Sequence, residues 1–130
     1  MSAARAIIAG HAAFADGMLS AVRQIAGRDD VFIAVTNRDL SAQDVERTLR
    51  ERVSESGAEV IFTDLPAGSC TMAARRLQRE RPALMVVTGA NLATLIDFVF
   101  HDDLSPAEAA RHAVDKGRGA LEIIGVPRGA

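Results

Sequence analysis

Short apolar runs alternate with longer amphipathic segments along almost the whole chain, and this alternation most constrains the fold. A short apolar run fits a strand covered on both faces, and apolar residues at every third or fourth position fit a helix packed on a sheet. Strands that alternate with helices form parallel sheets with right-handed crossovers. The sequence therefore predicts an α/β protein, a single doubly wound domain over residues 1–130 with a central, mostly parallel sheet flanked by helices.

Capping residues and glycines set the expected ends of these elements. Gly27 and Gly57 end two helices, and Ser105, Pro106 and Glu108 combine an N-cap, a first-turn proline and a capping-box glutamate. The predicted strands cover residues 5–9, 31–35, 60–63 and 83–87, with a last short strand at 121–126. The predicted helices cover residues 12–26, 41 to about 56, 69–80, 91–100 and 105 to about 117.

Composition limits the classes of partner and compartment. A formal net charge of −2 gives no reason to expect nucleic acid, and the lack of Trp and Tyr removes most stacking surfaces for nucleotides or sugars. The single cysteine, Cys70, cannot form an internal disulfide, which favours a cytoplasmic protein. No apolar run approaches the roughly 18 residues that span a bilayer, and Gly10-His11 interrupts the apolar stretch that resembles a signal peptide. We expect no direct membrane insertion.

His11 carries the strongest functional signal, because it stands between a predicted strand and the helix that follows. In open α/β sheets, ligands bind at the carboxyl ends of the strands, where such a turn lies. An imidazole there is a potential nucleophile, and the adjacent helix N-terminus can hold an anion attached to it. This combination predicts phosphoryl transfer through a phosphohistidine.

Two further strand-to-helix turns, 64–69 and 88–91, should lie along the same edge. Asp64 is suited to accept a hydrogen bond from one ring nitrogen of His11, which fixes the tautomer and leaves the other nitrogen free. Gly68 and Ser69 begin a helix and offer N–H groups and a hydroxyl to phosphate oxygens. Gly89 would let the backbone approach the site. The candidate catalytic residues are His11 and Asp64, and the candidate phosphate-binding residues are Gly10, Gly68 and Ser69.

Each of these residues also has a plain structural interpretation. Ser69 alone is a helix N-cap, Asp64 alone is a turn residue, and Cys70 is better explained as a small packed side chain than as a reactive thiol. His101 and His112 are assigned to the surface, and His112 has no partner nearby in sequence. A metal site at residues 101–103 is disfavoured because adjacent residues seldom converge on one ion, so no metal and no cofactor are expected.

Several enzyme classes lack their motifs here. Neither G-x-G-x-x-G nor G-x-x-x-x-G-K-[ST] occurs, and Ser69 does not lie in G-x-S-x-G. A receiver domain would need acidic residues after the first strand to hold magnesium, where this chain has Gly10-His11.

Three segments in order resemble the EIIA component of the mannose-type sugar phosphotransferase system. They are residues 7–18 around His11, residues 62–69, which are similar to the family's Asp-x-x-Gly-Gly-Ser-Pro turn, and residues 86–92, which are similar to its Gly-x-Asn-Leu segment. Two positions depart from the pattern: Ala67 replaces the first glycine of Gly-Gly-Ser, and Cys70 replaces the proline after it. These departures bear on docking geometry and partner choice.

The resemblance implies a homodimeric phosphocarrier. His11 would accept a phosphoryl group from phospho-HPr and pass it to a histidine of an EIIB protein for sugar uptake, with Asp64 orienting His11 and Ser69 binding the phosphoryl group. The apolar residues 120–126, after a flexible break at 117–119, are expected to pair with a sheet edge of the same or a second subunit. Three alternatives remain: a regulatory phosphocarrier without a permease, a phosphocarrier serving dihydroxyacetone kinase, and a catalytically silent binding module.

Overall fold

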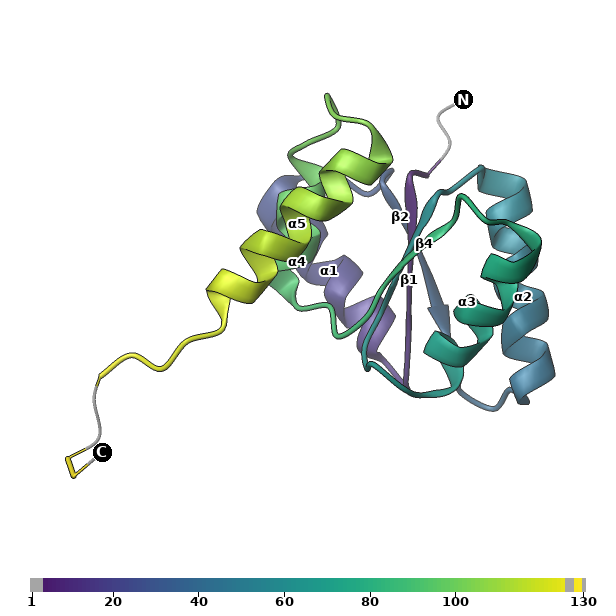
Figure 1. Cartoon of the computed structure of the whole chain (residues 1–130), viewed down its shortest axis with the longest axis horizontal. Coiled ribbons are helices and arrows are strands. Elements are labelled where there is room, and N and C mark those ends of the chain that lie inside the picture. Colours follow the sequence, from purple (N-terminus) through teal and green to yellow (C-terminus); the bar gives the residue numbers. More distant parts are fainter. Residues whose placement is uncertain (1–3, 126–127, 130) are drawn as a thin grey trace.

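Four parallel strands form the centre of the part of the chain that the computed structural model describes, residues 4–125 and 128–129 (Figure 1). The strands are β1 (Ala6–Gly10), β2 (Phe32–Thr36), β3 (Val60–Thr63) and β4 (Met85–Val87). The helices are α1 (Phe14–Ala26), α2 (Ala42–Ser56), α3 (Ser69–Glu80), α4 (Leu92–Val99) and α5 (Pro106–Ala120). The predicted doubly wound α/β fold is confirmed.

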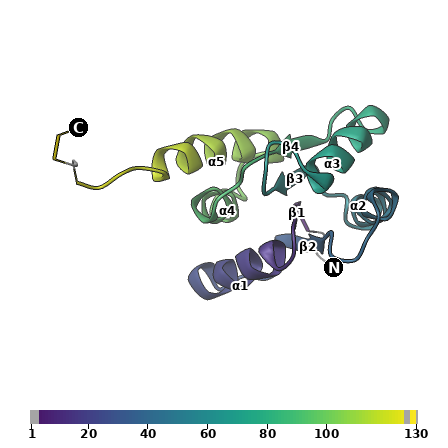
Figure 2. The same ribbon diagram turned by 90° about the horizontal axis from the view of Figure 1, so that it is seen from below.

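The helices cover both faces of the sheet. Figure 2 shows α1, α4 and α5 on one side of the strands and α2 and α3 on the other. Side chains of β1 alternate between these layers, as the pleat requires. Ala6 and Ile8 belong to the apolar cluster with α1, α4 and α5, whereas Ile7 and Ala9 belong to the cluster with α2 and α3. All four side chains are fully buried, which explains why the run contains no polar residue.

The strand order β2-β1-β3-β4 creates a switch point between β1 and β3. From β1 the chain passes through α1 to β2, whereas from β3 it passes through α3, on the opposite face, to β4. The two connections diverge between the turns that follow β1 and β3, and in open α/β sheets this is the place where ligands bind. Residues 11–13 and 64–68 form these turns.

Most predicted ends agree with the structure to within one residue, and two elements begin two residues later than predicted, for clear reasons. Helix α1 begins at Phe14 instead of at residue 12, because residues 11–13 form a turn in which the Phe14 N–H donates to the His11 carbonyl oxygen at 2.9 Å. Strand β4 begins at Met85 instead of at residue 83, because Leu84 closes a turn by donating its N–H to the Arg81 carbonyl oxygen at 3.0 Å.

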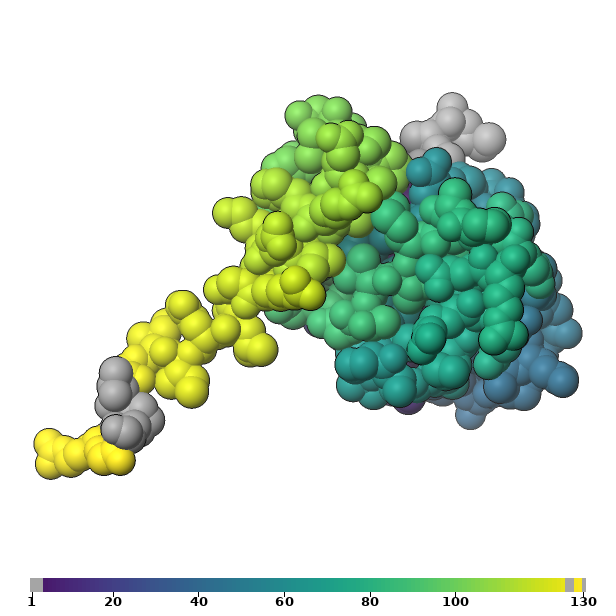
Figure 3. Space-filling view, viewed as in Figure 1, coloured from purple at the N-terminus to yellow at the C-terminus, as the bar shows by residue number. Residues whose placement is uncertain are grey.

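The predictions for the C-terminal segment are wrong in two respects. Helix α5 continues through the expected break at 117–119 to Ala120, because Gly117 packs against α4 and its carbonyl oxygen accepts a 2.9 Å hydrogen bond from Asn91 Nδ2. Residues 121–125 form no strand, and Val126 lies outside the described residues. This segment leads away from the sheet, so it has no strand to pair with (Figures 1 and 3).

None of the helices in the described part of the chain combines the length and apolar character needed to cross a bilayer.

Candidate active site

His11 and Asp64 meet across the switch point, where the turns after β1 and β3 lie side by side. His11 Nδ1 lies 2.8 Å from Asp64 Oδ2, and the same oxygen accepts the backbone N–H of His11, also at 2.8 Å. With an ionised Asp64, Nδ1 must carry the shared proton, which leaves Nε2 of the neutral ring as the nucleophilic atom. The His11 side chain is 48% exposed, so Nε2 is open to a partner protein.

The Asp64 carboxylate is stabilised in its charged form despite its position. Burial by itself raises the pKa of this group, but the hydrogen bonds from the backbone and the ring of His11 help to outweigh burial and hold the pKa of Asp64 below its usual value. Its second oxygen, Oδ1, is buried without a hydrogen-bond partner among the described residues. The partly buried Asp64 carboxylate is therefore stabilised mainly by its hydrogen bonds to His11.

Two glycines make room for this pair. A Cβ on Gly10 would lie 2.6 Å from Phe14 Cδ2 and 3.0 Å from Asp64 Oδ2, so a larger residue would push the carboxylate aside. A Cβ on Gly68 would lie 3.1 Å from His11 Cε1 and 3.9 Å from Nε2. Gly68 therefore places the start of α3 directly against the nucleophilic edge of the ring.

Helix α3 begins beside His11 with its first amides uncapped by any side chain. The first N–H groups of a helix have no partner within the helix, and together with the helix dipole they favour an anion. Ser69 occupies the first position of α3, and its Oγ accepts a 2.7 Å hydrogen bond from Asn37 Nδ2. A hydroxyl can accept and donate at once, so the Ser69 O–H is chemically able to donate to an anion at this turn.

Asn37 is a site residue that the sequence analysis misses. It follows β2, and its own N–H donates to the Gly10 carbonyl oxygen at 3.2 Å. The sequence did contain a signal for this residue. Residues 36–37 follow a predicted strand, so they are expected at the same sheet edge as His11. Its neighbour Thr36 also contributes, because its hydroxyl donates to the Ala12 carbonyl oxygen at 2.8 Å.

Ala12, directly after His11, has a backbone φ of 49°, in the left-handed region that a residue with a Cβ seldom adopts. The contact with Thr36 helps to hold it there. Strain of this kind costs on the order of 1–3 kcal/mol and is typical of functional turns.

The third predicted turn, 88–91, does not contribute side chains that contact this pair. Asn91 caps α4 by accepting the Thr94 N–H at 3.0 Å, and it also donates to Gly117 on α5. A Cβ on Gly89 would have open space around it, so a glycine is not needed here for close packing of the backbone. Its backbone φ of 66° lies in the left-handed region, which favours glycine. The expected role of Gly89 in the site is therefore not supported.

The remaining candidates are placed as follows. Cys70 is fully buried among apolar side chains of the α2–α3 layer, and burial together with the Asp64 charge raises the pKa of its thiol to about 11, as expected for a packed side chain.

His101 and His112 are partly exposed, as expected, but the structure adds a partner that the sequence did not reveal. Both rings face Asp97 of α4, and this group lies apart from His11.

Several solved structures share the fold of this chain. The mannose/sorbose-specific IIA subunit of the phosphotransferase system from Enterococcus faecalis has a TM-score of 0.82 and 24% identity, with 98% of each chain covered. The phosphotransferase component EIIA from Streptococcus agalactiae has a TM-score of 0.82 and 22% identity, over 92% of this chain and 95% of that one. The PTS IIA protein associated with the fucose utilization operon of Streptococcus pneumoniae has a TM-score of 0.79 and 20% identity, over 95% and 96%.

Residues 5–115 match the EIIA-man family, described as the PTS system fructose IIA component. The chain belongs to this family and is an EIIA component of the phosphotransferase system. No curated protein sequence matches it.

Proposed function

We propose that His11 Nε2 accepts a phosphoryl group from phospho-HPr and passes it to a histidine of an EIIB protein in the cytoplasm. The observation that carries the proposal is the 2.8 Å contact between His11 Nδ1 and Asp64 Oδ2, beside the uncapped start of α3. The contact leaves Nε2 as the nucleophile, and the helix N-terminus offers a place for the negative oxygens of the group that Nε2 receives. Family membership supports the same partners.

In the accepting step, the bond between phosphorus and the donor imidazole breaks while a bond forms between phosphorus and His11 Nε2. The His11 ring keeps its Nδ1 proton and becomes positively charged, and the donor imidazole leaves with the electron pair of the broken bond. Asp64 stabilises the new charge, as an aspartate does for an imidazolium in other nucleophilic sites. Passing the group to EIIB reverses these changes.

The phosphoryl oxygens would lie at the first turn of α3. The Gly68 contact brings Nε2 to this turn, where Ser69 supplies a hydroxyl and the helix supplies its free N–H groups. Asn37 holds the Ser69 oxygen in place. Such a site needs no metal, because transfer between imidazoles depends on in-line positioning and on stabilisation of charge. The site contacts protein partners only, so it does not select the sugar.

The test is incubation of the full chain with Enzyme I, HPr and phosphoenolpyruvate, followed by intact mass measurement. We expect one acid-labile phosphoryl group per chain, located on His11 by fragmentation under neutral conditions. A stable, unmodified chain under conditions in which HPr is fully phosphorylated would favour the silent binding module instead.

We further propose that residues 1–130 act as one domain that forms a homodimer. Three of the five residues in segment 121–125 are large and apolar, and these side chains, Leu121, Ile123 and Ile124, are 84–89% exposed. Exposure of so much apolar surface to water is unfavourable. Strand β4 is an edge strand, and a groove of about 420 Å³ runs along it, lined in part by Ala110 and Val114 of α5. The exposed segment of one copy would pair with the β4 edge of the other. This pairing would cover the apolar side chains of the segment and provide partners for the unpaired backbone groups of β4.

Truncation after Ala120 tests the dimer, because Ala120 is the last residue of α5. Light scattering should show a dimer for the full chain and a monomer, or a marked rise in the dimer dissociation constant, for the truncated chain. Phosphorylation of His11 should persist in both. A truncated chain that dimerises as tightly as the full chain would contradict the role given to this segment.

A further inference from the structure

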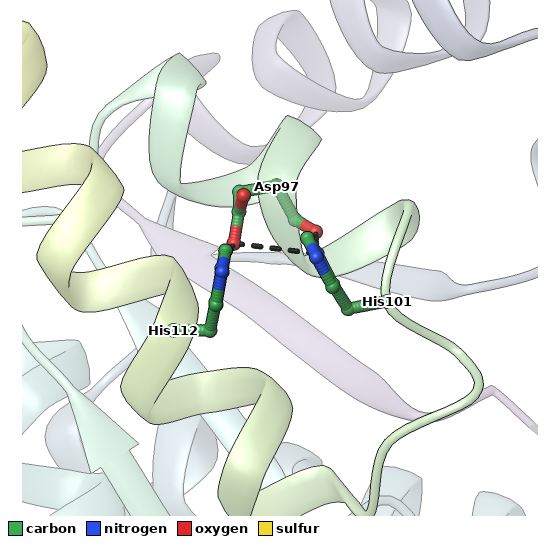
Figure 4. A group of neighbouring side chains, drawn as sticks. All are labelled: Asp97, His101 and His112. Atoms are coloured by element: carbon green, nitrogen blue, oxygen red, sulfur yellow. Dashed lines mark hydrogen bonds and ion pairs between the residues drawn. The ribbon is translucent and has the colours of Figure 1, made fainter.

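Asp97, His101 and His112 form a cluster at the junction of α4 and α5 (Figure 4). Asp97 lies on α4, His101 lies in the turn after it, and His112 lies in the second turn of α5. One ligand atom from each residue lies within 4.8 Å of the other two. The two imidazole rings stand side by side, with centroids 4.1 Å apart and an angle of 38° between their planes.

The distances suit a small metal ion. Asp97 Oδ2 lies 2.7 Å from His112 Nδ1 and 3.5 Å from His101 Nδ1. The ligand atoms of a tetrahedral zinc ion, at bond lengths of about 2.0–2.1 Å, lie about 3.3 Å apart. The two distances from Asp97 Oδ2 differ from this spacing by less than about 1 Å, and all three ligand atoms lie within 4.8 Å of one another.

We propose that Asp97, His101 and His112 bind a divalent cation of the zinc type. Two imidazole nitrogens and one carboxylate oxygen are preferred by Zn²⁺ and its neighbours Co²⁺ and Ni²⁺, whereas Mg²⁺ and Ca²⁺ prefer oxygen ligands alone. Three protein ligands leave the fourth position to water. A nitrogen that binds the ion carries no proton, so the single N–H of each neutral ring would shift from Nδ1 to Nε2 when Nδ1 binds the ion.

The exposure of the three side chains is compatible with entry of an ion. The Asp97 side chain is only 11% exposed, whereas the imidazoles of His101 and His112 are 30% and 43% exposed and leave a path for the ion. Without an ion, His101 Nδ1 also lies 2.8 Å from the Asp97 carbonyl oxygen, a hydrogen bond that metal binding would replace. The loss of that bond should keep the affinity moderate.

The cluster lies far from the proposed phosphorylation site. Arg5, which precedes β1, donates through its guanidinium to the carbonyl oxygens of His101 at 3.3 Å and Leu104 at 2.7 Å. His11 follows the other end of β1, about 20 Å away at about 3.3 Å per residue. A bound ion would therefore not touch the phosphoryl group. It would link the end of α4 to α5, the helix that leads into the exposed apolar segment.

Calorimetric titration of the metal-free full chain with ZnCl₂ tests the site. We expect one zinc ion per chain, and binding at least about tenfold weaker in His101→Gln, His112→Gln and Asp97→Asn, since each change removes a ligand. His11→Ala is the matched control, because it removes the other histidine without touching the cluster, and it should bind zinc like the unaltered chain.

A second measurement does not depend on variants. Co²⁺ added to the unaltered chain should give the intense visible absorption of four-coordinate cobalt and should shift the ring proton signals of His101 and His112, leaving those of His11 in place. Absence of zinc binding, one ion shared by two chains, or equal binding by the unaltered chain and the His101→Gln/His112→Gln double variant would overturn the proposal.

Discussion

Two histidine–aspartate pairs in this chain have almost the same internal geometry and different surroundings. His11 Nδ1 lies 2.8 Å from Asp64 Oδ2, and His112 Nδ1 lies 2.7 Å from Asp97 Oδ2. Both aspartate side chains are 11% exposed, and both histidines are nearly half exposed. The ring of His11 lies against Gly68 at the start of a helix, whereas the ring of His112 lies beside another imidazole.

The comparison teaches that the pair alone does not define a phosphoryl acceptor. An aspartate fixes the tautomer of its histidine in both places, but of the histidines in the described part of the chain only His11 is shown with its ring against the uncapped start of a helix, at Gly68. The second imidazole beside His112 supplies a lone pair and not an anion-binding group. The first setting favours an incoming anion, and the second favours an incoming cation.

The largest expected difference between the pairs is in phosphorylation itself. His11→Ala should abolish labelling by phospho-HPr, because no other imidazole faces an anion-binding turn, whereas His101→Ala and His112→Ala should be labelled normally. Intact mass after incubation with the phosphorylating system measures this directly. Full labelling of His11→Ala would show that the surroundings described above do not select the acceptor.

The aspartates should differ in kinetics. Asp64→Asn should slow phosphoryl transfer by about 10²-fold or more, because the amide no longer holds the Nδ1 proton or stabilises the charged ring. Asp97→Asn is the matched control and should transfer at the normal rate. Rapid-quench measurement of the transfer from phospho-HPr gives both rates, and circular dichroism confirms that each variant is folded. Equal transfer rates in the two variants would show that Asp64 has no special role in phosphoryl transfer.

The close approach of α3 should have a smaller effect. Gly68→Ala places a methyl group 3.1 Å from His11 Cε1 and should slow transfer by roughly tenfold, since the ring must shift by a few tenths of an ångström. Gly17→Ala, on α1 with open space around it, is the control and should leave transfer unchanged while stabilising the fold by about 0.5–1 kcal/mol. A Gly68→Ala chain with normal kinetics would show that Nε2 does not need this turn.

The smallest effect concerns acid stability at the first pair. Because the folded-state pKa of Asp64 is held below 3.8, its ionisation stabilises the fold above that pH, and the contribution is lost as the pH falls through the folded value. Urea unfolding at a series of pH values should show a constant difference in unfolding free energy between the unaltered chain and Asp64→Asn above about pH 5, shrinking at lower pH. A difference that grows on acidification would contradict the assigned direction.

Much of the fold and part of the site follow from local sequence. Fully apolar runs such as residues 7–9 predict strands buried on both faces, and a polar residue directly after such a run predicts its place at the sheet edge. His11, Asp64 and Ser69 were found in this way, because each is the first polar group after a strand or the first residue of a helix. Asn37 was open to the same reasoning and was missed.

The pairing of Asp97 with His112 could not be read from the chain in the same way, unlike the spacing of four residues between Asp97 and His101. His112 is separated from Asp97 by 15 residues and by a turn whose path no local pattern specifies. The C-terminal segment shows the opposite case. Residues 121–125 have strand-like composition, but a strand also requires pairing with a neighbouring strand, and this segment pairs with none in the described part of the chain. Local composition thus predicts which element a segment prefers, but not which partner it meets.

The order of apolar and polar residues was sufficient to define the alternating strands and helices, their two-sided burial and the edge at which His11 lies, because these depend on neighbours along the chain. The contact between His11 and Asp64, the support of Ser69 by Asn37 and the meeting of two imidazoles at Asp97 depend on how the layers pack. Strand order and helix packing set distances between residues far apart in sequence, and those distances separate one histidine–aspartate pair from the other.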